Sequence, residues 1–231
     1  METTVISLGG SIVAPEGVDA DFLRDFVKIT RELLIADADR RFIFVVGGGG
    51  PARAWQKAYK DVCTSFFSPI DKAADWIGVM ATRLNAQLVK AVMGELCKDE
   101  VVTDPSGDVM FTGRTLIAAG WKPGFSSDFD AVLLAEKFGA KTLINLSNIE
   151  RVFTDDPRKN PAAKPLDIVS WKDFRAMVGE EWVPGKNTPF DPVASRYADK
   201  IGLKVICAAG RNLPNLENIL NGKPFMGTTI S

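Results

Sequence analysis

The chain has 231 residues, of which 46% are apolar and 25% charged, and its formal net charge is -1. These values are ordinary for a soluble globular protein of one or two domains, and the balanced charge argues against nucleic-acid binding. The sequence contains no histidine, which excludes Ser-His-Asp hydrolysis, general-base catalysis by histidine and histidine-ligated metal sites.

The cysteines and the N-terminus predict a cytoplasmic location. Cys63, Cys97 and Cys207 are too few and too widely spaced for a disulfide framework or a zinc site, and an odd number suits a reducing compartment. The first seven residues lack the basic segment of a signal peptide. No stretch approaches the ~18 apolar residues of a membrane span, so no membrane partner is expected.

Short apolar runs that end in glycine alternate with helical patterns in the first part of the chain. Two buried strands are predicted, each followed by glycines, over residues 3–8 and 42–46. Three helices are predicted, over residues 19–37, from Pro51 onward, and over residues 70–93. This alternation indicates a parallel sheet built from βαβ units.

The pattern continues in the rest of the chain, with shorter elements. Strands are predicted over residues 101–102, 109–111, 116–119, 142–146 and 203–207. Helices are predicted over residues 127–138, 171–178, 191–201 and 213–220. Ser126, Ser127 or Asp128 caps the first of these helices. The segments 155–167 and 183–189 are predicted to be proline-containing loops.

The carboxyl ends of these strands are the expected place for a ligand, since open parallel sheets bind ligands there. Four segments lie at such ends: 9–11, 47–53, 120–128 and 145–157. A glycine loop ahead of a helix lets backbone N–H groups approach a phosphate, although glycines also simply make tight turns. For the four glycines that precede Arg53 we favour phosphate binding. The P-loop pattern is absent. The G-x-G-x-x-A match at 47–52 is only a weak sign of a dinucleotide site, because the acidic residues near the expected distance, Asp71 and Asp75, lie in helical sequence rather than at the end of a strand.

Two further groups of residues are compatible with a site. Asp75, Gly78 and Thr82 share one face of the helix predicted over 70–93, where the glycine allows either a ligand or a crossing helix to approach. The segment 123–128 gathers two hydroxyls and a carboxylate at a helix start, which is also the pattern of ordinary capping. Asp155-Asp156-Pro157 is by itself a typical turn.

The order of the motifs resembles the amino acid kinase superfamily and, within it, the archaeal-type uridylate kinases. The resemblance spans nearly the whole chain, and its most specific parts are the D-x-x-G-x-x-x-T-R-x-N-A stretch and the D-P-x-A stretch. The motifs occur in this order: Ser7-Leu8-Gly9-Gly10-Ser11, Val45-Val46-Gly47-Gly48-Gly49 with Arg53, Asp75 to Ala86, Ser126-Ser127-Asp128, Thr154-x-Asp156-Pro157, Asp191-Pro192-x-Ala194 and Gly227-Thr228-Thr229-Ile230.

The resemblance implies an α/β fold, an open αβα sandwich with a central, mostly parallel sheet. It implies a single domain over residues 1–231, with an acceptor half at about 1–140 and an ATP half at about 141–231. The implied activity is phosphoryl transfer from ATP, with Mg²⁺, to a nucleoside monophosphate, most simply UMP to UDP. Small-molecule nucleotides are the implied ligands, and homo-oligomers are usual among the similar proteins.

The resemblance also implies site residues. Residues implied to bind UMP are Gly48, Asp75, Lys122, Pro123, Gly124, Phe125, Ser126 and Ser127. Residues implied to bind ATP are Gly9, Gly10, Ser11, Gly49, Arg53, Ser147, Asn148, Phe153 and Asp156. Arg53, Lys186 and Asp128 are the implied catalytic residues, and no protein site for a metal is implied. A phosphate acceptor is already ionised, so the absence of histidine fits this chemistry.

The chain departs from the superfamily pattern at several positions, which keeps two alternatives open. Trp121 and Lys122 differ from the usual acceptor loop and would suit a related kinase with another acceptor. Ser7 stands where many members carry lysine, and Arg151 and Phe153 stand where glycine and tyrosine are usual. Ser7 and Arg151 would suit a non-catalytic protein that binds a nucleotide or an oxyanion on the same fold.

Overall fold

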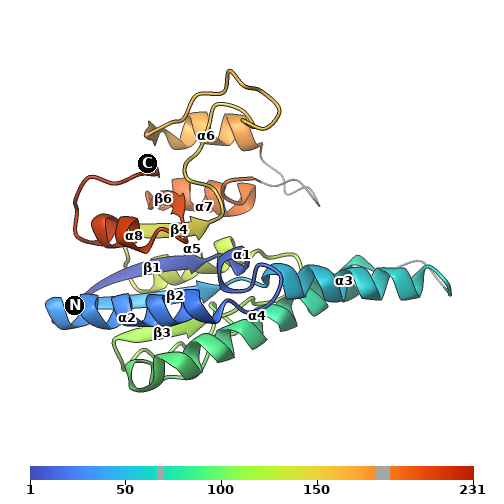
Figure 1. The fold of residues 1–231 in the computed structure, drawn as a ribbon, viewed down its shortest axis with the longest axis horizontal. Coiled ribbons are helices and arrows are strands. Elements are labelled where there is room, and N and C mark those ends of the chain that lie inside the picture. Colours follow the sequence, from blue (N-terminus) through green and yellow to red (C-terminus); the bar gives the residue numbers. More distant parts are fainter. Residues whose placement is uncertain (67–69, 180–187) are drawn as a thin grey trace.

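The computed structural model describes residues 1–66, 70–179 and 188–231. Within these ranges the strands form one sheet in the order β3-β2-β1-β4-β6-β7-β5 (Figure 1). The strands are β1 Glu2–Leu8, β2 Arg40–Val46, β3 Thr115–Ala118, β4 Thr142–Ser147, β5 Ile168–Val169, β6 Lys204–Ala209 and β7 Thr228–Ile230. Every neighbouring pair is parallel except β6 and β7, so the prediction of a mostly parallel sheet is confirmed.

Helices cover both faces of this sheet. They are α1 Gly10–Val13, α2 Ala20–Ala36, α3 Gly49–Cys63, α4 Asp71–Met93, α5 Ser127–Lys137, α6 Trp171–Val178, α7 Pro192–Lys200 and α8 Leu213–Leu220, with a 3-10 turn at Gly94–Leu96. Buried residues of α2, α4 and α8 share one apolar core with one face of the strands. Buried residues of α5, α6 and α7 share a second core with the other face. Alternate side chains of β1, such as Val5 and Ile6, enter opposite cores, as the period of a strand requires.

Helix α3 is the exception among these helices, because only Ala52 and Cys63 of its residues are buried. It packs against α4, and Figure 1 shows the two helices reaching together beyond the end of the sheet. Apolar side chains are exposed on this pair, among them Trp55, Met80 and Leu84. Within the described ranges, no helix has the length and apolar character needed to cross a membrane.

The predicted strands over 101–102 and 109–111 are wrong. Of the first pair only Val102 makes a single bridge, to Ala118, and residues 109–111 belong to no strand. Their apolar residues serve packing instead, since Val109 and Phe111 lie against the core and the Phe111 ring is 5.5 Å from that of Phe138. An apolar run that buries side chains without a neighbouring strand forms no ladder of hydrogen bonds.

Other differences concern the ends of the sheet and the helices. Helix α3 begins at Gly49 rather than at Pro51, and the short elements α1, β5 and β7 are additions to the predicted set. Part of the predicted loop 183–189 lies outside the described residues. The three cysteines are buried free thiols.

Candidate functional site

The glycine loops after β1 and β2 pack directly against each other. The Gly9 N–H donates to the carbonyl of Leu146 at 2.9 Å, which joins the ends of β1 and β4. A Cβ atom on Gly10 would lie 2.0 Å from the nitrogen of Gly49, so no larger residue fits between the two loops. Gly49 itself has φ +67°, a conformation that favours glycine. Close packing therefore accounts for these glycines, and phosphate binding by their N–H groups stays a prediction.

The D-x-x-G-x-x-x-T-R-x-N-A stretch lies in α4 and joins two loops at the carboxyl edge of the sheet. The Asn85 side chain donates to the carbonyls of Gly47 and Gly48 at 2.9 and 3.1 Å. Thr82 accepts the Gly120 N–H through its hydroxyl oxygen at 2.8 Å. One helix thus sets the positions of the loops after β2 and β3 relative to each other.

Gly78, in the same stretch, fits the helix-crossing interpretation. A Cβ atom there would lie 2.6 Å from Nε2 of Gln56, whose carboxamide donates to the carbonyl of Ala74 at 3.0 Å. Helix α3 therefore crosses α4 at Gly78, one turn after Asp75. The side chain of Asp75 is partly exposed beside this crossing.

A cavity of about 250 Å³ lies between α3, α4, the loop after β3, and the first turns of α5 and α7. It brings together most of the residues predicted to bind the acceptor, from two segments far apart in the sequence. Its lining residues are Ala52, Gln56, Asp75, Gly78, Val79, Thr82, Gly120, Lys122, Pro123, Gly124, Phe125, Ser126, Ser127, Phe129, Asp191 and Val193. We call it the acceptor cavity. Gly48 lies behind its wall, where a Cβ atom would be 2.7 Å from that of Ala52.

Aromatic rings and one ammonium group lie at one side of the acceptor cavity, which Lys122, Phe125 and Phe129 line and to which Trp121 is adjacent in the chain. The ring of Trp121 lies 4.8 Å from that of Phe125, which lies 5.3 Å from that of Phe129. Nζ of Lys122 is 3.6 Å from the centre of the Trp121 ring and 5.1 Å from that of Phe125. These cation–π contacts hold the ammonium group at the cavity.

Carboxylates lie at the junction of β1, α5 and α7. The Ser7 hydroxyl donates to Oδ1 of Asp128 at 3.1 Å, and the backbone N–H of Asp191 donates to Oδ2 at 3.2 Å. Burial, with the nearby Asp191 carboxylate, raises the pKa of Asp128 to about 6. Burial also raises the pKa of Asp191, which caps α7 by accepting the Ala194 N–H at 2.7 Å.

Asp191 was not among the predicted site residues, although it lines the acceptor cavity. The D-P-x-A motif was the available signal, because an aspartate before Pro192 marks a helix N-terminus. Capping alone is a structural role. Asp191 becomes part of the cavity wall because α7 packs against α5, and this packing depends on the tertiary structure.

Of the two basic residues predicted to be catalytic, Arg53 alone lies within the described residues. Arg53 is exposed, five residues into α3, where Nη2 donates to the carbonyl of Pro15 at 3.2 Å. It does not line the acceptor cavity, but it lies next to the two glycine loops. Lys186 falls outside the described residues.

Of the residues predicted to bind ATP, some share the carboxyl edge of the sheet. Gly9, Gly10 and Ser11 follow β1, and Ser147 and Asn148 stand at the end of the neighbouring strand β4. The structure therefore brings these residues to one edge, as the parallel topology requires.

Phe153 and Asp156 lie farther along, in the loop before β5. Phe153 forms a bridge with Pro165. The carboxylate of Asp156 takes two hydrogen bonds of 3.0 Å from the guanidinium of Arg158, which lowers the pKa of Asp156. Arg151 donates to Oδ1 of Asp167 at 2.8 Å. A separate hollow of about 400 Å³ next to this segment is lined by Glu150, Ala209, Arg211, Asn212, Pro214, Asn215 and Met226, none of them predicted.

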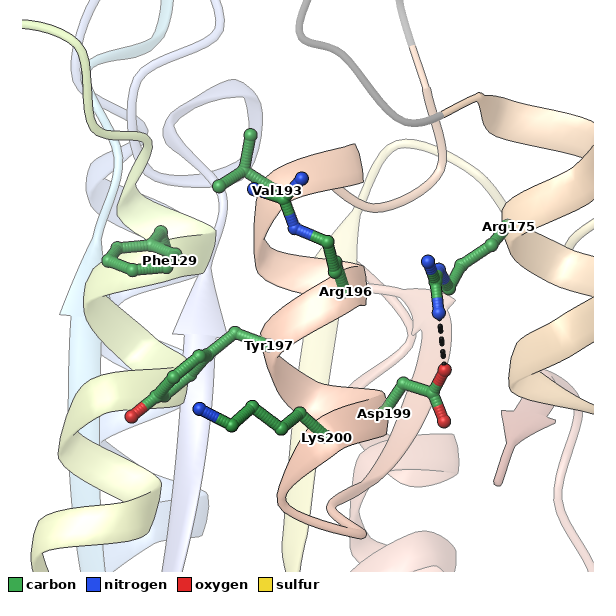
Figure 2. A pocket seen from close by; sticks show the side chains of 7 residues that line it. All are labelled: Phe129, Arg175, Val193, Arg196, Tyr197, Asp199 and Lys200. Carbon is green, nitrogen blue, oxygen red and sulfur yellow. Dashed lines mark hydrogen bonds and ion pairs between the residues drawn. The ribbon is translucent and has the colours of Figure 1, made fainter.

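A third hollow, of about 580 Å³, surrounds the exposed side of α7 and is shown in Figure 2. Arg196 and Lys200 extend from this helix, while Arg175 of α6 is paired with Asp199 at 2.7 Å. None of the predicted site residues lines it. Phe129 and Val193 line both this hollow and the acceptor cavity, so they form the partition between them.

Comparison with known proteins agrees with this architecture. The sequence pattern of the Amino acid kinase family matches residues 2–209. The chain is 34% identical to a uridylate kinase of Methanospirillum hungatei, covering 100% of this chain and 95% of that protein. It is 32% identical to a uridylate kinase of Pyrococcus abyssi, covering 98% of each. The crystal structure of the uridylate kinase from Archaeoglobus fulgidus superposes with a TM-score of 0.82 at 27% identity, over 100% of both chains. The chain belongs to the amino acid kinase family.

Proposed function

We propose that this protein transfers the γ-phosphoryl group of ATP to UMP, producing UDP and ADP. The observation that carries the proposal is the acceptor cavity, which gathers Asp75 and residues 122–127 at the carboxyl edge of the sheet. We propose UMP as the ligand of this cavity because the chain is similar over its full length to proteins named uridylate kinase. The proposed division is an acceptor half at about 1–140 and an ATP half at about 141–231.

The acceptor cavity has groups suited to a nucleoside monophosphate. The partly exposed carboxylate of Asp75 would accept hydrogen bonds from both ribose hydroxyls, which is a charge-assisted arrangement. Lys122 would donate to an oxygen of the bound nucleotide, because an ammonium group has donors only. Ser126 and Ser127 add hydroxyls at the start of α5, where the helix dipole favours an anion.

Phosphoryl transfer requires two oxygen atoms held in line and positive charge around the transferring group. Arg53 follows the glycine loop after β2 within three residues and donates to the carbonyl of Pro15, which follows α1, so we assign it to the phosphoryl group. Lys186 keeps its proposed catalytic role from the sequence. Asp128 joins β1 to the start of α7 by accepting hydrogen bonds from Ser7 and Asp191. These bonds would keep the two proposed nucleotide sites at a fixed distance and orientation.

Mg²⁺ enters this proposal as part of the MgATP substrate. Among the described residues, no three side chains of His, Cys, Asp or Glu cluster closely enough to hold a metal. Mg²⁺ is often bound through the substrate's phosphates with only one or two carboxylates. Gly9, Gly10, Ser147 and Asn148 would then line the phosphates and the nucleoside of ATP at the ends of β1 and β4.

Homo-oligomerisation and a cytoplasmic location are further parts of the proposal. The exposed apolar side chains of Trp55, Met80 and Leu84 on the α3–α4 pair would be covered by a second copy of the chain. The three free thiols suit a reducing compartment. Light scattering during gel filtration would measure the mass, and Leu84→Glu should lower it. A monomeric wild-type mass would contradict the oligomer.

The function is tested by transfer of labelled phosphate from [γ-³²P]ATP to a panel of nucleoside monophosphates. We expect label in UDP, with UMP the best acceptor. Transfer to a different acceptor would support the related-kinase alternative that Trp121 and Lys122 suggest. Binding of nucleotide without transfer to any member of the panel would overturn the proposal and favour a non-catalytic binding protein.

A further inference from the structure

Asp130 of α5 is a buried acid with an unusual environment. Its side chain is fully buried, with 0% exposed. Oδ2 accepts the backbone N–H of Trp121 at 3.1 Å, while Oδ1 has no hydrogen-bond partner in the part of the chain that the structure describes. The charged groups that face it, Asp128 of the same helix and Asp104 of the loop before β3, are both acidic. A buried polar atom without a hydrogen-bond partner lowers the stability of the folded state, so a carboxyl in this position is expected to serve a role that offsets the loss.

Trp121, the partner of Asp130, is held from two helices. Its N–H donates to Asp130 on α5, and its carbonyl accepts from Nη2 of Arg83 on α4 at 2.8 Å. Both backbone hydrogen bonds of Trp121 are therefore made by side chains, and no strand or helix fixes this residue. These two side chains therefore set the backbone position from which the indole ring extends, and the ring itself packs 4.8 Å from that of Phe125 and gives a side-chain hydrogen bond to Asp104.

The indole ring in turn contacts the ammonium group of Lys122, a residue that lines the acceptor cavity. Lys122 is the one basic residue among the described residues that line this cavity, where Asp75 and Asp191 are the acids. Its ammonium group rests 3.6 Å from the centre of the Trp121 ring. A movement of the ring would move the preferred position of the ammonium group with it.

We propose that Asp130 is a positioning residue for the acceptor site: by anchoring the Trp121 N–H, it fixes the indole ring that holds the Lys122 ammonium group against the bound nucleotide. Asp130 does not line the cavity, so it acts only through Trp121 and Lys122. The inference rests on the proposed function, in which the acceptor cavity holds UMP.

The charge state of Asp130 suits this role. Burial raises the pKa of Asp130 to about 7, and the Asp128 and Asp104 carboxylates act in the same direction, against the effect of the Trp121 N–H. The acid is therefore mostly protonated below pH 7. A protonated carboxyl accepts from Trp121 through one oxygen and resembles an asparagine side chain in shape and hydrogen bonding. Asparagine should consequently replace Asp130 in the anchoring role.

A double-mutant cycle tests the coupling between Asp130 and Lys122, with steady-state constants for UMP and ATP measured separately. Asp130→Ala and Lys122→Met should each raise the KM for UMP by about tenfold, the size expected for the loss of a hydrogen bond to a charged group. The double variant should stay near tenfold rather than reach about a hundredfold, since both changes remove one interaction. The KM for ATP should stay within about twofold, and Asp130→Asn should keep the wild-type KM for UMP.

Val132→Ala is the matched control, because Val132 is buried in the same helix but its apolar side chain has no acceptor for the Trp121 N–H. It should lower stability without changing the KM for UMP. Independent effects of the Asp130 and Lys122 changes, equal rises of both KM values, or failure of Asp130→Asn to keep the wild-type value would overturn the inference. If the wild-type protein makes no UDP, the proposed function is wrong, and the inference, which rests on it, is wrong as well.

Discussion

The carboxamide of Asn85 donates to the carbonyl of Gly47 across 2.9 Å, joining the middle of α4 to the loop after β2. The same nitrogen lies 3.1 Å from the carbonyl of Gly48. Asn85 is buried, so these hydrogen bonds are not exchanged with water. The acceptor cavity and the glycine loops are thereby parts of one framework.

Asn85→Ala should weaken this framework as a whole. The change leaves the buried Gly47 carbonyl without its side-chain donor, a loss of about 1–3 kcal/mol in the free energy of unfolding. We expect both KM values to rise, because the loop stands between the two proposed nucleotide sites. Denaturant unfolding and steady-state kinetics measure the two effects. Gln87→Ala, an exposed change two residues along α4, is the control, and an Asn85→Ala variant as stable as this control would contradict the assignment.

Arg53→Ala tests the proposed contact with the transferring phosphoryl group. An arginine in that position is worth ~10³-fold or more in rate, so kcat/KM should fall by about that factor while folding is unchanged. Lys57→Ala, one turn farther along α3 and exposed, is the matched control and should behave as wild type. A kcat/KM value within about threefold of wild type would make Arg53 an ordinary surface residue.

Asp75→Asn tests the proposed contact with the ribose of UMP. The loss of charge-assisted hydrogen bonds of about 1.5–3 kcal/mol should raise the KM for UMP by roughly tenfold to a hundredfold, with little change for ATP. Asp71→Asn, exposed one turn earlier in α4, provides the comparison. Equal weakening of both substrates would indicate a defect in the fold, and no change would make Asp75 a solvated residue.

Arg151 provides a test of the ATP half, since glycine is usual at its position in the resembling proteins. Its guanidinium is paired with Asp167 at 2.8 Å, and its side chain is only 22% exposed. We therefore expect Arg151 to leave the nucleotide site open. Calorimetric titration with a non-hydrolysable ATP analogue and Mg²⁺ should show micromolar binding by the wild-type protein. Absence of binding at millimolar analogue, restored in Arg151→Gly, would overturn this expectation and favour a non-catalytic protein.

The raised pKa of Asp130 predicts a pH-dependent stability. Its folded-state value of about 7 lies above the ordinary value of 3.8, so the folded state holds this proton more tightly than the unfolded chain does. The contribution of Asp130 to stability is therefore complete below pH 3.8 and is lost as the pH rises through about 7.

Asp130→Asn removes this dependence, since asparagine does not ionise. Its Tm advantage over the wild type should grow as the pH rises from about 4 to about 7, and should be larger at pH 8 than at pH 5 by about 3 °C or more, given ~2–4 °C per kcal/mol for a chain of this size. Differential scanning calorimetry at the two pH values measures the difference. Asp108→Asn, an exposed change, should show no such effect. Equal Tm differences at both pH values would mean that Asp130 does not titrate in this range.

The sequence by itself determined the elements whose signals are local. Helices α6 and α8 were predicted at their observed bounds, because the spacing of apolar residues repeats within each helix. Strands β1 and β4 were found as apolar runs that end at a loop. The order of the motifs was enough to indicate the family, since each motif is a short run of adjacent residues.

The tertiary structure alone decided which residues meet. Strands β5 and β7 have two and three residues, too few for a periodic pattern, and they exist because a neighbouring strand supplies their hydrogen bonds. Likewise Asp130 is an ordinary polar residue in the sequence of a helix. Its burial and its bond to Trp121 arise only when α5 packs under the loop after β3. Burial and pKa depend on neighbours distant in the chain, and a local pattern contains no information about them.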